Sequence, residues 1–105
     1  MIYNLTSENF NKYINESKKP FIVEFWATWC GFCLKQNPIL EKFAERHKEK
    51  INFARVNIEE SQELAQKYGA FSIPSFIIFK NGKEIEHIRG FQDENKLEMI
   101  ARSLN

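Results

Sequence analysis

Apolar positions along the chain follow two different periods, and the first of them predicts β-strands. Strand-like apolar runs occupy residues 1–4 (MIYN), 20–26 (PFIVEFW), 51–58 (INFARVNI), 75–79 (SFIIF) and 83–88 (KEIEHI). The run at 20–26 is almost continuously apolar, which is typical of a strand covered on both faces. The last two runs flank Asn81-Gly82, a dipeptide that favours a tight hairpin turn. Because Ile85 and Ile88 lie three positions apart, we expect a bulge or an exposed edge in the second hairpin arm.

The second period, with apolar residues three and four positions apart, predicts α-helices. Their apolar faces comprise Phe10, Tyr13 and Ile14; Leu40, Phe43, Ala44 and His47; Leu64, Ala65 and Tyr68; and Leu97, Ile100, Ala101 and Leu104. We expect Thr6 or Ser7 to cap the first helix, Gly69 to end the third and Asp93 to cap the last. The order β-α-β-α-β-α-β-β-α indicates an α/β fold, with a central mixed sheet of about five strands flanked by about four helices.

Composition and charge exclude several classes of protein. The 105 residues suit one domain, residues 1–105, in which 43% of positions are hydrophobic and 28% are charged. The net charge is +1 and the longest basic run is Lys18-Lys19, so we expect no nucleic-acid partner. No apolar run approaches the ~20 residues of a membrane span, and the N-terminal residues lack the features of a secretory signal. We therefore expect a cytoplasmic monomer without a membrane partner, although a mature secreted chain would have the same features.

Both cysteines of the chain, Cys30 and Cys33, lie in the segment WCGFC. A structural disulfide across so short a loop stabilises a fold by only about 2 kcal/mol. A structural zinc site needs about four ligands, and the two histidines, His47 and His87, do not have finger-like spacing from the cysteines. Redox chemistry is the leading interpretation, while a structural disulfide and a zinc site shared between chains remain alternatives.

The position of the two cysteines predicts a different role for each. They lie where a buried strand is expected to end and a long helix to begin. The unpaired N–H groups and the positive dipole end of a helix stabilise a thiolate there. Lowering a thiol pKa from about 8.5 toward 7 raises the thiolate fraction at neutral pH from a few per cent to about half. Cys30 is therefore the expected nucleophile, and Cys33, one turn inside the helix, the expected resolving thiol.

Five features in order resemble the thioredoxin family over essentially all 105 residues. The segment FIVEFWATWCGFC resembles the strand that leads into the family's W-C-G-P-C motif, and Pro38 stands where thioredoxins kink the following helix. The segment FSIPS at 71–75 resembles the one with the family's cis-proline, FKNGK matches its hairpin, and Gly90 matches its glycine that faces the active site. The resemblance implies the thioredoxin fold with a cis Ile73-Pro74 bond, whereas the residues alone favour a strand-entry proline.

The resemblance also implies a function and its partners. A thioredoxin reduces disulfides in client proteins through a reversible dithiol/disulfide pair, here Cys30 and Cys33, which a thioredoxin reductase regenerates as electron donor. No cofactor and no metal are expected. A disulfide oxidant or isomerase would use the same chemistry, but the CxxC contains no histidine and no signal peptide is evident. A non-catalytic binding subunit of the same fold is a further alternative.

By the family's layout, an apolar rim around the nucleophile receives the client. Its expected members are Trp29, Gly31, Phe32, Ile73, Pro74, Gly90 and Phe91. For Ile73 and Phe91, the alternative is a place in the core. Phe32 departs from the family's usual proline. Its N–H can reach a thiolate and it loosens the turn, so we expect a couple somewhat less reducing than that of a W-C-G-P-C protein.

Glu24 interrupts the apolar run at 20–26, where an unpaired buried carboxylate is costly. Thioredoxins usually have an aspartate at this position, behind the second cysteine. The resemblance therefore implies that Glu24 has a raised pKa and accepts the Cys33 proton, directly or through water. A half-exposed strand glutamate is the alternative. Arg55 matches a position where the family often has lysine near the buried acid, and it either tunes Glu24 or is a solvated strand end.

Overall fold

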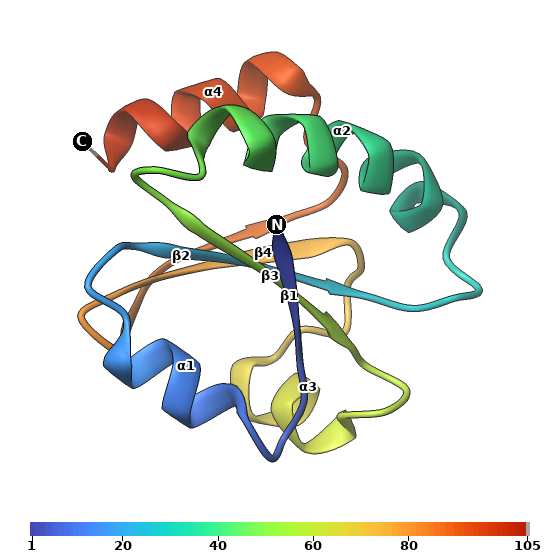
Figure 1. Ribbon diagram of the computed structural model, residues 1–105. Helices are drawn as coiled ribbons and strands as arrows, with labels where there is room; N and C mark the ends of the chain where they lie inside the picture. The colour runs from blue at the N-terminus through green and yellow to red at the C-terminus, as the bar shows by residue number, and fades with distance from the viewer. Residues whose placement is uncertain (105) are drawn as a thin grey trace.

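Figure 1 shows the computed structural model of the chain, which describes residues 1–104. A central five-stranded sheet is covered by helices on both faces, and its strand order is β1-β3-β2-β4-β5. The strands are β1 (Ile2–Leu5), β2 (Phe21–Trp26), β3 (Asn52–Asn57), β4 (Ser75–Lys80) and β5 (Lys83–Arg89). The helices are α1 (Phe10–Glu16), α2 (Gly31–His47), α3 (Gln62–Tyr68) and α4 (Glu94–Ser103). This order of elements is the one that the two hydrophobic periods predict.

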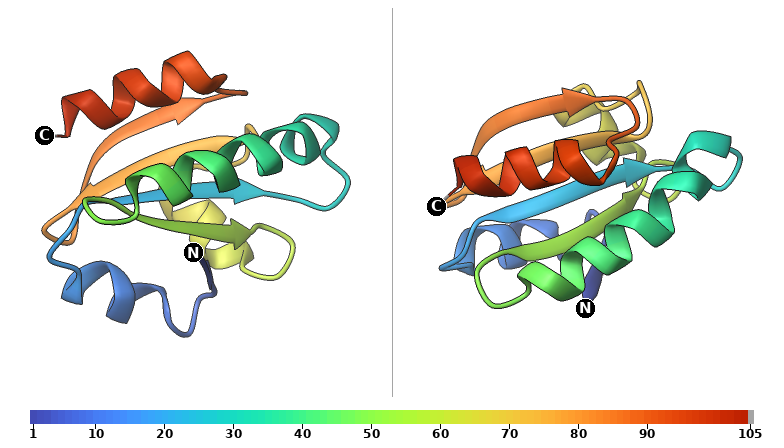
Figure 2. Two further views of the ribbon diagram at one scale, coloured as in Figure 1. Left: turned by 45° about the horizontal axis from the view of Figure 1, so that its top comes forward. Right: turned by 90° about the horizontal axis from the view of Figure 1, so that it is seen from above.

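The sheet is mixed and separates two apolar cores. β1 and β2 each pair in parallel with β3, whereas β4 is antiparallel to β2 and β5 is antiparallel to β4. Successive side chains of a strand point to opposite faces, so Val23 and Phe25 of β2 pack in the core with α1 and α3. Ile22 packs in the other core, with α2 and α4. Figure 2 shows α2 and α4 on the same side of the sheet.

Strand pairing brings three distant parts of the chain together where strands β2, β4 and β5 reach the same end of the sheet. Phe25, near the end of β2, lies opposite Ser75 at the start of β4. Ser75 in turn lies opposite Arg89 at the end of β5. Three segments therefore meet at this end of the sheet: the β2–α2 loop with Cys30, the segment that precedes Ser75 and the loop that follows Arg89.

Several local predictions are confirmed. Asn81 and Gly82 both have positive φ, at 54° and 78°, as a two-residue hairpin turn requires. The β4–β5 pairing contains a register shift, and β5 is an edge strand, so both features expected of the second hairpin arm are present. Gly69 follows α3 in the left-handed conformation, with φ 63°. Asp93 caps α4, where its side chain accepts a hydrogen bond from the Lys96 N–H at 2.9 Å.

The expected cap of the first helix is wrong. α1 begins at Phe10, and Asn9 rather than Thr6 or Ser7 occupies the N-cap position. Thr6 belongs to a turn: its N–H donates to Asn9 Oδ1 at 2.7 Å, and its carbonyl accepts from the Phe10 N–H at 2.9 Å. Short polar side chains serve turns as well as caps, so the pattern alone places the helix start too early.

Candidate active site

Cys30 and Cys33 form a disulfide where β2 leads into α2, with their Cα atoms 5.2 Å apart. Cys30 is the N-cap residue of this 17-residue helix, and its Sγ accepts a hydrogen bond from the Cys33 N–H at 3.1 Å. The exposed fraction is 6% for Cys30 and 0% for Cys33. The more accessible sulfur therefore lies where a helix N-terminus stabilises negative charge, as the sequence predicts.

Phe32 contributes apolar surface next to the disulfide. The amide that reaches Cys30 Sγ in this form belongs to Cys33, and the contact expected between the Phe32 N–H and a Cys30 thiolate concerns the reduced form and stays a prediction. The Phe32 side chain is 63% exposed, and its ring centroid lies 6.5 Å from that of Phe91. In this disulfide form, the departure from proline therefore enlarges the apolar surface next to the cysteines.

The cis-proline segment lies against the disulfide. Ile73 packs, together with Trp26 and Ile58, against the small apolar cluster that the two cysteines form with Ala27. The Ile73-Pro74 bond is cis, as the resemblance implied. The Gly90 N–H donates to the Pro74 carbonyl at 2.8 Å, which joins this segment to the β5–α4 loop.

The predicted rim residues differ in how much surface they offer. Trp29 is 67% exposed, and Gly31, the first residue of α2, is exposed as well. Ile73, Gly90 and Phe91 are half-buried, and Pro74 is buried. For Ile73 and Phe91, the expected place in the rim and the alternative place in the core are each partly right, because both residues are half-buried. Pro74 adds little side-chain surface to the rim.

Glu24 is a fully buried carboxyl group, so the half-exposed alternative is wrong. It lies on the same face of β2 as Ile22, the face that α2 covers. Arg55, its partner in β3, donates from Nε to Glu24 Oε1 at 3.3 Å and from Nη2 to the Asn37 carbonyl in α2 at 3.1 Å. Within residues 1–104, no protein group forms a hydrogen bond with Glu24 Oε2.

The surroundings of Glu24 change its charge state. Burial raises the pKa of Glu24 from 4.5 to about 7, and the nearby charge of Arg55, together with its hydrogen bond, partly opposes the rise. The Arg55 side chain is only 14% exposed. Of the two interpretations of Arg55, the structure supports the one in which it tunes Glu24 rather than a solvated strand end.

Sequence reasoning overlooked a buried pair of glutamines. Gln36 and Gln92 are 0% and 7% exposed, and two hydrogen bonds join the Gln36 side chain to the Gln92 main chain. A signal was present, because Gln36 lies four residues before Leu40 and seven before Phe43, on the apolar face of the predicted helix. A polar side chain at that spacing needs a buried partner.

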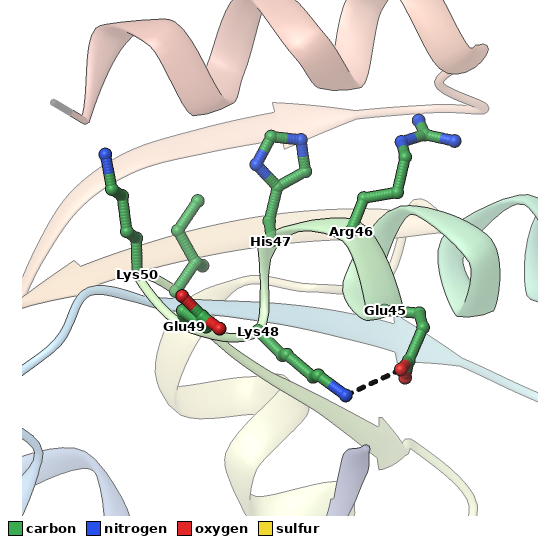
Figure 3. A pocket seen from close by; sticks show the side chains of 7 residues that line it. Glu45, Arg46, His47, Lys48, Glu49 and Lys50 are labelled. Atoms are coloured by element: carbon green, nitrogen blue, oxygen red, sulfur yellow. Dashed lines mark hydrogen bonds and ion pairs between the residues drawn. The ribbon is translucent and has the colours of Figure 1, made fainter.

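Other features of the molecule lie apart from this site. Figure 3 shows a hollow lined by residues 45–51, at the opposite end of α2 from Cys30. The helix has 17 residues, so at about 1.5 Å per residue its two ends are about 25 Å apart.

Within residues 1–104, no group of three or more His, Cys, Asp or Glu side chains is arranged to hold a metal ion. In the same part of the chain, none of the helices has the length and apolar character needed to cross a membrane.

Comparisons with known proteins agree with this geometry. The family model described as thioredoxin matches residues 1–103. The thioredoxin of Alicyclobacillus acidocaldarius subsp. acidocaldarius is 42% identical over 94 residues, which cover 90% of this chain and 89% of that protein. The thioredoxin of Rickettsia felis is 37% identical over 97 residues, 92% of each chain. That of Chlorobaculum thiosulfatiphilum is 35% identical over 103 residues, 98% of this chain and 93% of its own. The chain therefore belongs to the thioredoxin family and is a thioredoxin-type thiol-disulfide oxidoreductase.

Proposed function

We propose that this chain reduces disulfides in client proteins, with Cys30 as the nucleophile and Cys33 as the resolving thiol. The observation that supports this most is the position of the Cys30 sulfur, which caps α2 and accepts the Cys33 N–H. A helix N-terminus and a hydrogen bond to sulfur both favour the thiolate, the reactive form. The small exposure of Cys30 gives a client disulfide access to it.

The proposed reaction has two exchange steps. The Cys30 thiolate attacks one client sulfur, so that a mixed disulfide forms, the client disulfide breaks, and the released client thiolate takes up a proton. Cys33 then loses its proton and attacks Cys30 Sγ, which forms the Cys30–Cys33 disulfide and releases the second client sulfur as a thiol. The client gains two electrons from the chain and two protons. Counted from the dithiol, the chain also loses two protons, because the Cys30 thiol gives its proton to solvent when the thiolate forms and Cys33 gives up the other. A thioredoxin reductase, as electron donor, returns the chain to the dithiol.

Glu24 is the proposed acceptor of the Cys33 proton, directly or through water. With a pKa of about 7, its carboxyl group is close to half ionised at neutral pH, so it can take up a proton and release it again. The hydrogen bond and charge of Arg55 stabilise the ionised form that accepts the proton. Burial alone would leave a larger fraction of this carboxyl protonated.

Client proteins are proposed to bind at the rim beside the disulfide. The exposed side chains of Trp29 and Phe32 provide apolar contacts, and the backbone next to Pro74 can pair with an extended client segment. The other proposed contacts are Gly31, Ile73, Gly90 and Phe91. This surface suits a disulfide in a partly unfolded protein, where apolar side chains and free backbone groups are exposed.

We further propose a monomeric, single-domain protein, residues 1–105, that acts in the cytoplasm, where thiols are kept reduced.

Trapping of the mixed disulfide tests the assignment of the two cysteines. Cys33→Ser removes the resolving thiol, so incubation with insulin should accumulate a covalent complex through Cys30, seen on a non-reducing gel. The matched variant Cys30→Ser should form none. A complex that accumulates only in Cys30→Ser would reverse the two roles, and no complex in either variant would reject the reaction.

The reduction potential tests the direction of the reaction. Equilibration of the Cys30–Cys33 pair with thiol buffers of known potential should give a value close to, and because of Phe32 somewhat less negative than, the about −270 mV of thioredoxin. A value near about −180 mV or higher would assign the chain to disulfide formation or isomerisation instead.

A further inference from the structure

A pair of buried hydrogen bonds joins the helix that carries the cysteines to the loop that carries Phe91. Gln36 lies three residues after Cys33 on α2 and has no exposed surface. Its Nε2 donates to the Gln92 carbonyl at 2.9 Å, and its Oε1 accepts from the Gln92 N–H at 2.7 Å. One side chain thereby satisfies both main-chain groups of a residue that is 56 positions away.

The hydrogen bonds continue from this loop to the proline segment. The Gln92 side chain donates from Nε2 to the Gly90 carbonyl at 3.1 Å. The Gly90 N–H in turn donates to the Pro74 carbonyl at 2.8 Å. Gly90 has φ 94°, a conformation that favours glycine and lets the loop turn between the two contacts. A series of hydrogen bonds thus connects α2, the loop at residues 90–92 and the segment that contains Pro74.

These contacts favour a role in positioning over a role in packing alone. A leucine at position 36 would fill the apolar face of α2 without the cost of burying an amide. Hydrogen bonds depend on direction as well as distance, whereas apolar contacts depend little on direction. Two bonds to one residue therefore set both the distance and the orientation of the loop relative to the helix. Phe91, in the same loop, thereby lies 6.5 Å from Phe32, measured between ring centroids.

We infer that Gln36 is a positioning residue, which holds the loop at residues 90–92 beside Cys30 so that an extended client segment contacts both. This inference rests on the proposed reduction of client proteins. A protein disulfide is presented by a chain that lies across the rim, whereas a small disulfide reaches the Cys30 sulfur without that surface. Loss of the Gln36 hydrogen bonds therefore lowers the rate with a protein disulfide more than the rate with a small one.

The test is the ratio of two second-order rate constants, one for reduction of insulin and one for reduction of bis(2-hydroxyethyl) disulfide. Gln36→Met keeps the length of the side chain and removes both hydrogen bonds to Gln92. The ratio should fall about tenfold, which corresponds to the contribution of about one hydrogen bond. Ile14→Val is the matched control for lost stability, because it removes a methylene from the core beside α1 and should keep the ratio of the wild type.

A second variant keeps the inference testable if Gln36→Met does not fold. Gln92→Ala removes the side-chain bond to Gly90 and should lower the ratio in the same direction by a smaller factor. A wild-type ratio in a folded variant overturns the inference, because a purely structural glutamine would slow both reactions equally. A wild-type chain that reduces the small disulfide but not insulin would reject the proposed function, and the inference with it.

Discussion

Replacing Glu24 with glutamine tests the burial of this carboxyl group through the pH dependence of stability. Its pKa is about 7 in the folded chain, against an ordinary value of 4.5. Because the folded state holds the proton more tightly than the unfolded state does, protonation stabilises the fold. This stabilisation is complete below about pH 4.5 and is lost as the pH rises through about 7. At about 1.4 kcal/mol per unit of pKa, the difference of 7 − 4.5, about 2.5, corresponds to about 3 kcal/mol.

Urea denaturation of the disulfide form measures this effect. We expect the free energy of unfolding of the wild type, minus that of Glu24→Gln, to fall by about 3 kcal/mol between pH 4.5 and pH 8.5. Taking the difference cancels the titration of distant groups. Glu86→Gln, at an exposed position of the edge strand β5 and away from any helix end, is the matched control and should give a curve parallel to that of the wild type. If the free energy of unfolding of Glu24→Gln also changed with pH in parallel with that of the wild type, the desolvation of Glu24 would be refuted.

The same variant tests the proposed proton transfer. If Glu24 accepts the Cys33 proton, Glu24→Gln should change the pH dependence of insulin reduction, because amides do not titrate in this range. An identical pH–rate profile in the wild type and the variant would reject the role in proton transfer, even where the stability measurement confirms that Glu24 is buried.

The remaining predictions concern a charge and a helix cap. Arg55→Met removes the cation that lowers the pKa of Glu24, so this pKa should rise above about 7. In the urea series, the loss of stability should then occur at a higher pH than in the wild type. If the pH at the midpoint of this loss were the same as in the wild type or lower, the tuning role of Arg55 would be contradicted. Asp93→Ala removes the acceptor for the Lys96 N–H and should lower the free energy of unfolding by about 1 kcal/mol. An unchanged urea midpoint would show that the cap contributes nothing measurable.

The sequence by itself determined the order of the elements and the location of the chemistry. Hydrophobic periods of about two and 3.6 residues distinguish strands from helices because they reflect which side of an element is buried. The hairpin turn at Asn81-Gly82 and the end of α3 at Gly69 could be predicted for a different reason. Both require positive φ, which few residue types adopt without strain. The position of Cys30 at a helix start followed from the same local patterns. The cis form of Pro74 did not, and it was predicted only through the family resemblance.

Only the tertiary structure decided the environment of the polar groups. The sequence left Glu24 as buried or half-exposed, and it is buried because α2 covers that face of β2. The partnership of Gln36 with Gln92 spans 56 positions, so no local pattern could pair them. The physical reason is that a hydrophobic period depends on one element alone. A pKa or a hydrogen bond depends instead on atoms that packing brings from other elements.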